Sequence, residues 1–252
     1  MTLRLPRLAV ALAACSLVLG ACSDDGGEDA DGRDLESTTT APPTSTTTPE
    51  VTTTTIPPCP DVAAEEGGEA PQETAADVDG DGRDDQLVSY RTGGDAWRLE
   101  VELARGGGAA LDLASFGGAV GVMGGSDLDG DGAAEIWART GAGASTTIVS
   151  PFSVEGCDLA QVTFSTGEPA ELPVGGSVGT ASGVECTDDG QLLAFTASYT
   201  GDGTTETYQV TTVAYRLEDG VLAEQERSAT EVLANDPEFL RYTSFDCGPV
   251  TL

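Results

Sequence analysis

Two acidic runs, fifty positions apart, constrain this chain more than any other feature of its sequence. Residues 77–85 read Asp-Val-Asp-Gly-Asp-Gly-Arg-Asp-Asp, and residues 127–135 read Asp-Leu-Asp-Gly-Asp-Gly-Ala-Ala-Glu. Each run places a carboxylate at its first, third, fifth and ninth positions. Loops this rich in oxygen suit a hard divalent cation with a flexible shell of many oxygen ligands, a description that fits calcium better than magnesium or zinc.

The predicted calcium ligands form two sets with the same spacing. Their side chains are Asp77, Asp79, Asp81 and Asp85 in the first loop and Asp127, Asp129, Asp131 and Glu135 in the second. We expect the backbone carbonyl of the seventh residue, Arg83 or Ala133, to point inward as well. Glycines at the fourth and sixth positions permit the positive φ angles that curl a backbone around one ion. Metal removal would leave the carboxylates repelling one another, so metal binding and folding should be linked.

The two runs open like an EF-hand but end differently. An EF-hand requires a bidentate Glu at position twelve and a helix after it, whereas position twelve here is Val88 or Ala138. The segments that follow, 86–90 and 136–140, are rich in β-branched and aromatic residues and predict strands. Solvated turns are the alternative interpretation, because Asp and Gly are common in turns. Two copies with equal spacing, each opening a strand, favour the metal site.

This unit of acidic loop and strand resembles the FG-GAP and VCBS repeats, the calcium-bearing blades of integrin α-subunit propellers and of many bacterial surface proteins. The best match runs from Phe116 to Ile136 and opens with Phe116-Gly117, similar to the Phe-Gly of the family. A third, degenerate copy spans 185–199, where Leu193 replaces the closing acid, and we expect no ion there. The resemblance implies about three propeller-like blades, and an incomplete or open propeller, because a closed one normally has four to eight.

The N-terminal residues predict export and lipidation. Arg4 and Arg7 precede a mostly apolar stretch, Leu8 to Leu19, that is too short to span a bilayer. The residues Leu19-Gly-Ala-Cys22 resemble the bacterial lipobox, which implies a lipoprotein signal peptide at 1–21 and a lipid anchor at Cys22. Ordinary cleavage that leaves Cys22 as a spare thiol is the alternative. We therefore expect a lipid-anchored protein on the extracellular face of a bacterial cell membrane.

Residues 22–58 lack the apolar surface that a folded core requires. An acidic stretch at 23–36 is followed by a stretch rich in Thr and Pro at 37–58. We predict a disordered tether at 22–58 and a folded domain at 59–252.

Cysteine parity supports a lipid anchor together with disulfides. Cys15 would leave with the signal peptide and Cys22 would carry lipid. The four that remain, enough for two disulfides in an oxidising exterior, are Cys59, Cys157, Cys186 and Cys247. Four cysteines allow three pairings and the sequence selects none of them. We favour Cys59 with Cys157, and Cys186 with Cys247.

The folded region is predicted to be all-β and antiparallel. Alternating or β-rich stretches occur at 97–103, 110–114, 146–149, 159–164, 207–217 and 221–225. Turn signals separate them, of which Asp219-Gly220 is a strong hairpin signal. Only residues 229–240 suggest a short helix, and Pro237 weakens that prediction.

Charge and composition exclude several functions. The chain has a formal charge of −32, with no lysine and no histidine. An acidic surface repels nucleic acid, so we expect no nucleic-acid partner and instead cations or basic partners. Residues 175–179 match the G-x-S-x-G pattern of a nucleophile elbow. Because a chain without histidine has no Ser-His-Asp relay, that match is rejected.

We expect a non-catalytic cell-surface lipoprotein whose calcium-stabilised β domain binds an envelope protein or a glycan, or mediates adhesion. A passive structural component of the envelope is one alternative. A hydrolase that cleaves wall glycans with paired carboxylates is a less favoured one. Two acids about 5 to 9.5 Å apart in a cleft away from the loops would support the hydrolase, whereas a large exposed apolar patch would support binding.

Overall fold

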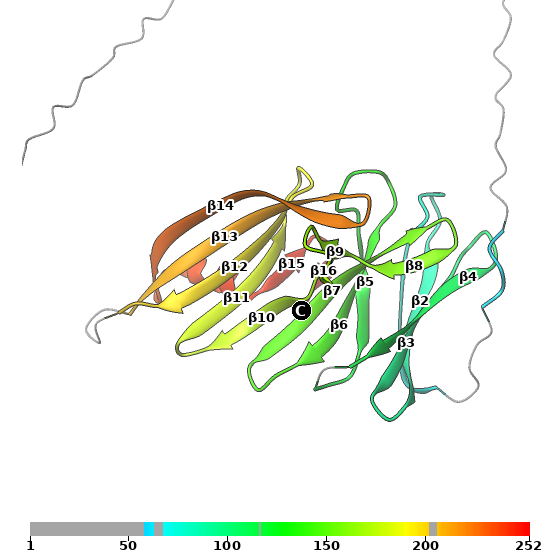
Figure 1. The fold of residues 1–252 in the computed structure, drawn as a ribbon, viewed down its shortest axis with the longest axis horizontal. Helices are drawn as coiled ribbons and strands as arrows, with labels where there is room; N and C mark the ends of the chain where they lie inside the picture. The colour runs from blue at the N-terminus through cyan, green and yellow to red at the C-terminus, as the bar shows by residue number, and fades with distance from the viewer. Residues whose placement is uncertain (1–57, 63–67, 116, 202–205) are drawn as a thin grey trace, which may run out of the picture. The chain divides into compact units, whose positions relative to one another are not determined.

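The computed structural model describes residues 58–62, 68–115, 117–201 and 206–252, which form an all-β fold (Figure 1). The predicted signal peptide, the anchor at Cys22 and the tether up to residue 57 lie outside the described residues, and so does Phe116 of the Phe-Gly lead. No helix in the described ranges has the length and apolar character needed to cross a bilayer.

The first sheet is a four-stranded antiparallel meander in the order β1-β2-β3-β4. Its strands are β1 (Glu69–Ala76), β2 (Asp85–Gly93), β3 (Ala96–Glu102) and β4 (Gly108–Ala114). The first acidic loop connects β1 to β2. Strand β1 contains Pro71 and pairs only with β2 in the sheet, a position where proline is tolerated because one side of the backbone has no ladder partner.

A second run of four strands repeats this antiparallel order. Its strands are β5 (Gly121–Ser126), β6 (Glu135–Ala142), β7 (Thr146–Glu155) and β8 (Asp158–Gln161). Each strand pairs antiparallel with the next. The second acidic loop connects β5 to β6, which is the place that the first loop occupies between β1 and β2.

A third antiparallel run follows, and its strands are β11 (Thr180–Cys186), β12 (Leu192–Tyr199), β13 (Thr207–Glu218) and β14 (Val221–Leu233). The degenerate third loop connects β11 to β12. Strand β10 (Leu172–Ser177) pairs with β7 on one side and with β11 on the other. The second and third runs therefore belong to one sheet.

Three short strands complete this larger sheet. Strand β9 (Thr163–Phe164) pairs parallel with β14, and β15 (Phe245–Cys247) pairs parallel with β11. Strand β16 (Val250–Thr251) pairs antiparallel with β15. The C-terminal residues thus form a small hairpin attached to the start of the third run.

The predicted all-β, antiparallel class is confirmed, whereas the propeller is not shown. The described strands form no closed ring of blades. Separate blades would have separate sheets, but hydrogen bonds through β10 join the second run to the third. The repeat prediction and the structure agree on one feature. The acidic loops occupy the same place in successive four-strand runs.

The predicted helix at 229–240 is wrong. Strand β14 continues to Leu233, because its backbone pairs with the whole length of β13. A 3-10 helix, η1 (Pro237–Thr243), follows, and the side chain of Asp236 caps it by accepting a hydrogen bond from the Glu238 amide. A complete ladder of hydrogen bonds outweighs the weak helical propensity of this short segment.

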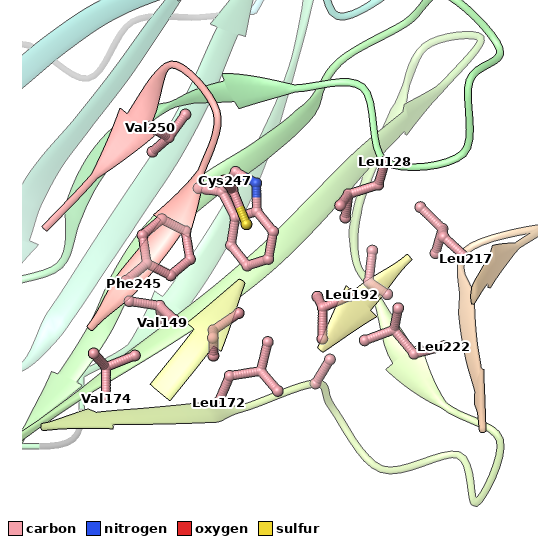
Figure 2. Close-up of a cluster of buried hydrophobic side chains, with 14 residues drawn as sticks. Leu128, Val149, Leu172, Val174, Leu192, Leu217, Leu222, Phe245, Cys247 and Val250 are labelled. Atoms are coloured by element: carbon pink, nitrogen blue, oxygen red, sulfur yellow. The ribbon is translucent and has the colours of Figure 1, made fainter. Parts of the chain in front are cut away.

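The largest cluster of buried hydrophobic side chains is formed mainly by strands of the larger sheet. Figure 2 shows Val149, Leu172, Leu192 and Leu222 from separate strands reaching one interior together with Phe245 of the C-terminal hairpin. Trp137 belongs to the same cluster and is fully buried. Its ring meets that of Phe245 edge to face at 4.9 Å between centroids, and its Nε1 donates to Ser126 Oγ at 2.8 Å.

A second core cluster lies between the first sheet and the second run. Leu87 and Leu99 from the first sheet share it with Ile136 and Phe152. Ile136 and Trp137 are neighbours on β6 and therefore point to opposite faces of the strand. Strand β6 is buried on both faces, because a different core covers each one.

Glycines in β5 permit the close approach of two other strands. A Cβ added to Gly125 would lie 2.6 Å from the Ala76 side chain of β1, and one added to Gly121 would lie 2.2 Å from Gln72. A Cβ on Gly124 would lie 3.0 Å from Val250 of β16. Larger residues in β5 would separate the first sheet and the C-terminal hairpin from this strand.

Two disulfides join distant segments in the pairing that we favoured. Cys59 bonds to Cys157 and Cys186 bonds to Cys247, with sequence separations of 98 and 61 residues. In the chain-entropy model, loops of this size correspond to about 4 to 5 kcal/mol of stabilisation each. The second disulfide holds the C-terminal hairpin against the third run.

Replacement of Trp137 by alanine tests the larger core. The variant loses a fully buried ring, its contact with Phe245 and its hydrogen bond to Ser126. We expect the free energy of unfolding to fall by roughly 3 to 5 kcal/mol, measured by urea denaturation in buffer with calcium. Val178→Ala is the control, since Val178 is 89% exposed and should change stability by less than about 0.5 kcal/mol. Equal effects of the two variants would contradict this description of the core.

Candidate metal centres

The two acidic loops end in the same way, with a buried carboxylate at the first residue of a strand. Asp85 begins β2 and is 1% exposed, and Glu135 begins β6 and is 5% exposed. The Val78 amide donates to Asp85 Oδ2 at 2.9 Å, and the Leu128 amide donates to Glu135 Oε2 at 2.8 Å. The ninth-position acid therefore closes each loop onto its second residue.

The first-position aspartates organise the turns inside the loops. Gly82 N donates to Asp77 Oδ2 at 2.8 Å, and Gly132 N donates to Asp127 Oδ2 at 3.1 Å. Both glycines have positive φ, 83° and 94°, the region that glycine adopts without strain. The two loops thus share this hydrogen bond and the positive φ of their sixth residue as well as one sequence pattern.

Each loop gathers three carboxylates. In both loops the first, third and ninth positions contribute oxygens that lie within 4.8 Å of one another, and the two groups are Asp77, Asp79 and Asp85 in the first loop and Asp127, Asp129 and Glu135 in the second. All donors are oxygens, which suits a hard cation. These two groups can hold a metal ion, and six of the predicted ligands are brought together in them.

The fifth and seventh positions are arranged differently from the prediction. Asp81 accepts from the Arg83 amide at 2.9 Å, and Asp131 accepts from the Ala133 amide at 2.8 Å. Neither carboxylate belongs to the groups of three. The Arg83 guanidinium also binds Asp81. The roles predicted for Asp81 and Asp131, and for the carbonyls of Arg83 and Ala133, stay predictions.

Burial and charge shift the pKa values of the loop carboxyls. Burial, with the nearby Asp129 charge, raises the pKa of Glu135 to about 8. Burial also raises the pKa values of Asp79 and Asp129 above their usual range, whereas the hydrogen bond from Arg83 lowers that of Asp81. The carboxyls of Asp79, Asp129 and Glu135 are therefore harder to ionise without a cation, so metal binding there is linked to proton release.

The third loop directs its polar side chains elsewhere. Glu185 binds the Arg241 guanidinium through both oxygens. Thr187 Oγ1 donates to Asp189 Oδ1 at 2.6 Å, and the Thr187 amide donates to the Gln191 carbonyl in a tight turn. Among the described residues, no group of three carboxylates forms in this loop.

A cleft of about 900 Å³, which the sequence pattern did not predict, lies where the three loops meet. Its acidic lining is Asp77, Asp84, Asp127, Asp129, Asp188 and Asp189. The Cys186–Cys247 disulfide and Val250 of the C-terminal hairpin line it as well. Each loop connects the first two strands of its run. Once the strands are known, this equal placement predicts that the three loops lie close together.

Comparisons with models of known protein families, with characterised proteins and with solved structures found no match. The resemblance to FG-GAP and VCBS repeats therefore depends on the loop pattern and stays a prediction.

The pKa of Glu135 predicts a pH dependence for the metal-free protein. Its folded pKa of about 8 lies above the ordinary value of 4.5, so the folded state binds this proton more strongly than the unfolded state between these values. We expect the free energy of unfolding to fall as pH rises from about 5 to about 8. Urea denaturation at a series of pH values, with chelator present, measures this slope.

Glu135→Gln should flatten the slope, because glutamine keeps an acceptor oxygen but does not titrate. Glu168→Gln, at an exposed position, is the matched control and should leave the slope as it is in the parent chain. An undiminished slope in Glu135→Gln would assign the pH dependence to other groups.

Proposed function

We propose that the two acidic loops bind calcium and that the chain is a lipid-anchored cell-surface protein that acts by non-catalytic binding or adhesion. One observation carries the metal assignment: two loops with the same carboxylate spacing each gather three carboxylates, one of which is a buried acid. Three carboxylate ligands leave room in a shell of six to eight oxygens for backbone carbonyls and water. Calcium accepts that number and that flexibility more readily than magnesium.

Calcium would stabilise the contact between the two sheets. The Ala134 amide at the end of the second loop donates to the Asp77 carbonyl at the start of the first, at 2.8 Å. A Cβ on Gly80 would lie 3.6 Å from the backbone of Gly132. Because the loops touch, ordering either of them also orders the boundary between the first sheet and the second run.

The acidic cleft is the proposed place of contact with a partner. It is large enough for a peptide side-chain cluster or a sugar unit, and carboxylates of three loops line it. Its negative charge favours a basic protein segment. Calcium bound in the loops would also offer coordination positions to the hydroxyl oxygens of an envelope glycan. A passive role in the envelope needs no such cleft.

The location of the protein is proposed from two lines of support. The two disulfides fit an oxidising exterior. The lipobox-like residues that end at Cys22 supply the anchor to the membrane.

Calcium titration of the full chain tests the metal assignment. We expect two bound ions per chain by isothermal titration calorimetry, with affinities in the range of about 10⁻⁴ to 10⁻³ M that is usual for extracellular modules. Excess calcium should raise the melting temperature and chelator should reverse the rise. Asp127→Asn should remove one ion, because it deletes a first-position ligand.

Asp158→Asn is the control for this titration, since Asp158 is exposed and lies in β8 outside both loops. It should retain both ions. An unchanged melting temperature and no heat of binding in the parent chain would refute the metal assignment.

A pull-down of bacterial envelope material with the protein as bait tests the binding role. Calcium-loaded chain should retain a glycan or protein that chelator releases, because the cleft borders both loops. Asp188→Asn with Asp189→Asn, which alters the cleft but neither group of three carboxylates, should weaken retention and keep both ions. Equal retention with and without calcium would favour the passive structural role.

A further inference from the structure

The two loops differ in the segment that packs against them. The turn between β3 and β4, residues 103–107, lies on the first loop. The Ala104 amide donates to Asp85 Oδ1 at 2.8 Å, and Arg83 Nη1 donates to the Ala104 carbonyl at 3.2 Å. This turn therefore fixes both the closing acid and the seventh residue of the first loop.

Arg105 brings a positive charge from this turn to the first group of carboxylates. Its Nε lies 2.9 Å from Asp79 Oδ2, and the two side chains are 13% and 5% exposed. Both atoms are buried and have no hydrogen-bond partner of good alignment, so the contact is an ion pair held by charge. Arg105 Nη2 also donates to the Gly156 carbonyl at 2.9 Å and lies 3.5 Å from Cys59 Sγ.

The second loop has an acidic environment at the corresponding place. Glu155 is the last residue of β7, directly before the β7–β8 turn, and the β13–β14 turn presents Asp219. With Asp129, Asp131 and Glu135 of the loop they line a cavity of about 120 Å³. Within the described ranges, no arginine pairs with a carboxylate of the second loop.

We propose that Arg105 is an internal counter-ion of the first loop that competes with calcium for Asp79, so that the second loop is the tighter calcium site. This inference rests on the proposed function, because it ranks the two sites that the function assumes. A divalent ion that enters the first loop has to displace a guanidinium from Asp79 or share the carboxylate with it, and both reduce the net attraction. The second loop has no such competitor and has two further acids nearby.

The other contacts of Arg105 explain how it stays close to the loop. Its bond to the Gly156 carbonyl ties it to the turn that carries Cys157, and Cys157 is bonded to Cys59. These contacts hold the guanidinium beside Asp79 in the structure. A calcium ion that displaces it from Asp79 would also alter the contact between the β3–β4 and β7–β8 turns.

Calcium calorimetry on the full chain and its variants tests the ranking. The parent chain should show two binding events of unequal affinity. Arg105→Gln should tighten the weaker event by about fivefold, the upper end of what one ion pair contributes, and leave the tighter event unchanged. Arg227→Gln is the matched control, because Arg227 pairs with Glu224 on β14 outside the loops and should change neither event.

Two further variants assign the events to the loops. Asp79→Asn should abolish the weaker event and Asp129→Asn the tighter one. Arg105→Lys, which keeps the positive charge, should leave the weaker event near its parent affinity, and this separates charge from packing if Arg105→Gln is poorly folded. The melting temperature in excess calcium reports the folding of each variant.

Two equal events in the parent chain, or a weaker event that Arg105→Gln leaves unchanged, would overturn the inference while the proposed function stands. Loss of the tighter event in Asp79→Asn would overturn it as well, because it would reverse the order of the sites. Absence of calcium binding in every variant would overturn the proposed function, and the inference with it.

Discussion

The structure of both loops depends on one interaction, the hydrogen bond between a buried carboxylate at the ninth position and the amide of the second residue. That second residue, Val78 or Leu128, is itself buried, and each belongs to a different core cluster. The apolar side chain fixes the start of the loop in the core, and its amide fixes the acid that starts the next strand. The positions of the predicted metal ligands are thus fixed by the hydrophobic cores beneath the loops.

The same arrangement connects the loops to the contact between the sheets. The Ala134–Asp77 backbone bond joins one loop to the other, and the buried Ser89 hydroxyl accepts from the Val122 amide across the boundary. Glycines of β5 allow β1 to approach closely. These contacts place the carboxylates of both loops directly at the boundary between the sheets.

The sequence predicted the loops and the strands that follow them, because each has a strong local signal. The favoured disulfide pairing is confirmed, although the sequence by itself left three pairings open. The sequence missed β1, β5, β10 and β11, whose residues mostly have low β propensity, and the short C-terminal strands β15 and β16. Pro71 is tolerated because β1 is an edge strand and because Pro71 lies at an irregularity in the pairing with β2. The glycines of β5 are explained by the close approach of Ala76, Gln72 and Val250. The helix predicted at 229–240 failed for the same reason, since pairing with β13 decides that segment.

The sequence by itself determined the spacing of the carboxylates, because the bonds that shape each loop join residues no more than seven positions apart. Only the tertiary structure decided what surrounds those carboxylates. It placed Arg105 against Asp79 and Glu155 with Asp219 beside the second loop, through turns that are remote from the loops in the chain. Two loops with nearly one sequence pattern therefore have opposite electrostatic environments, since an electrostatic field depends on distance in space and not on separation along the chain.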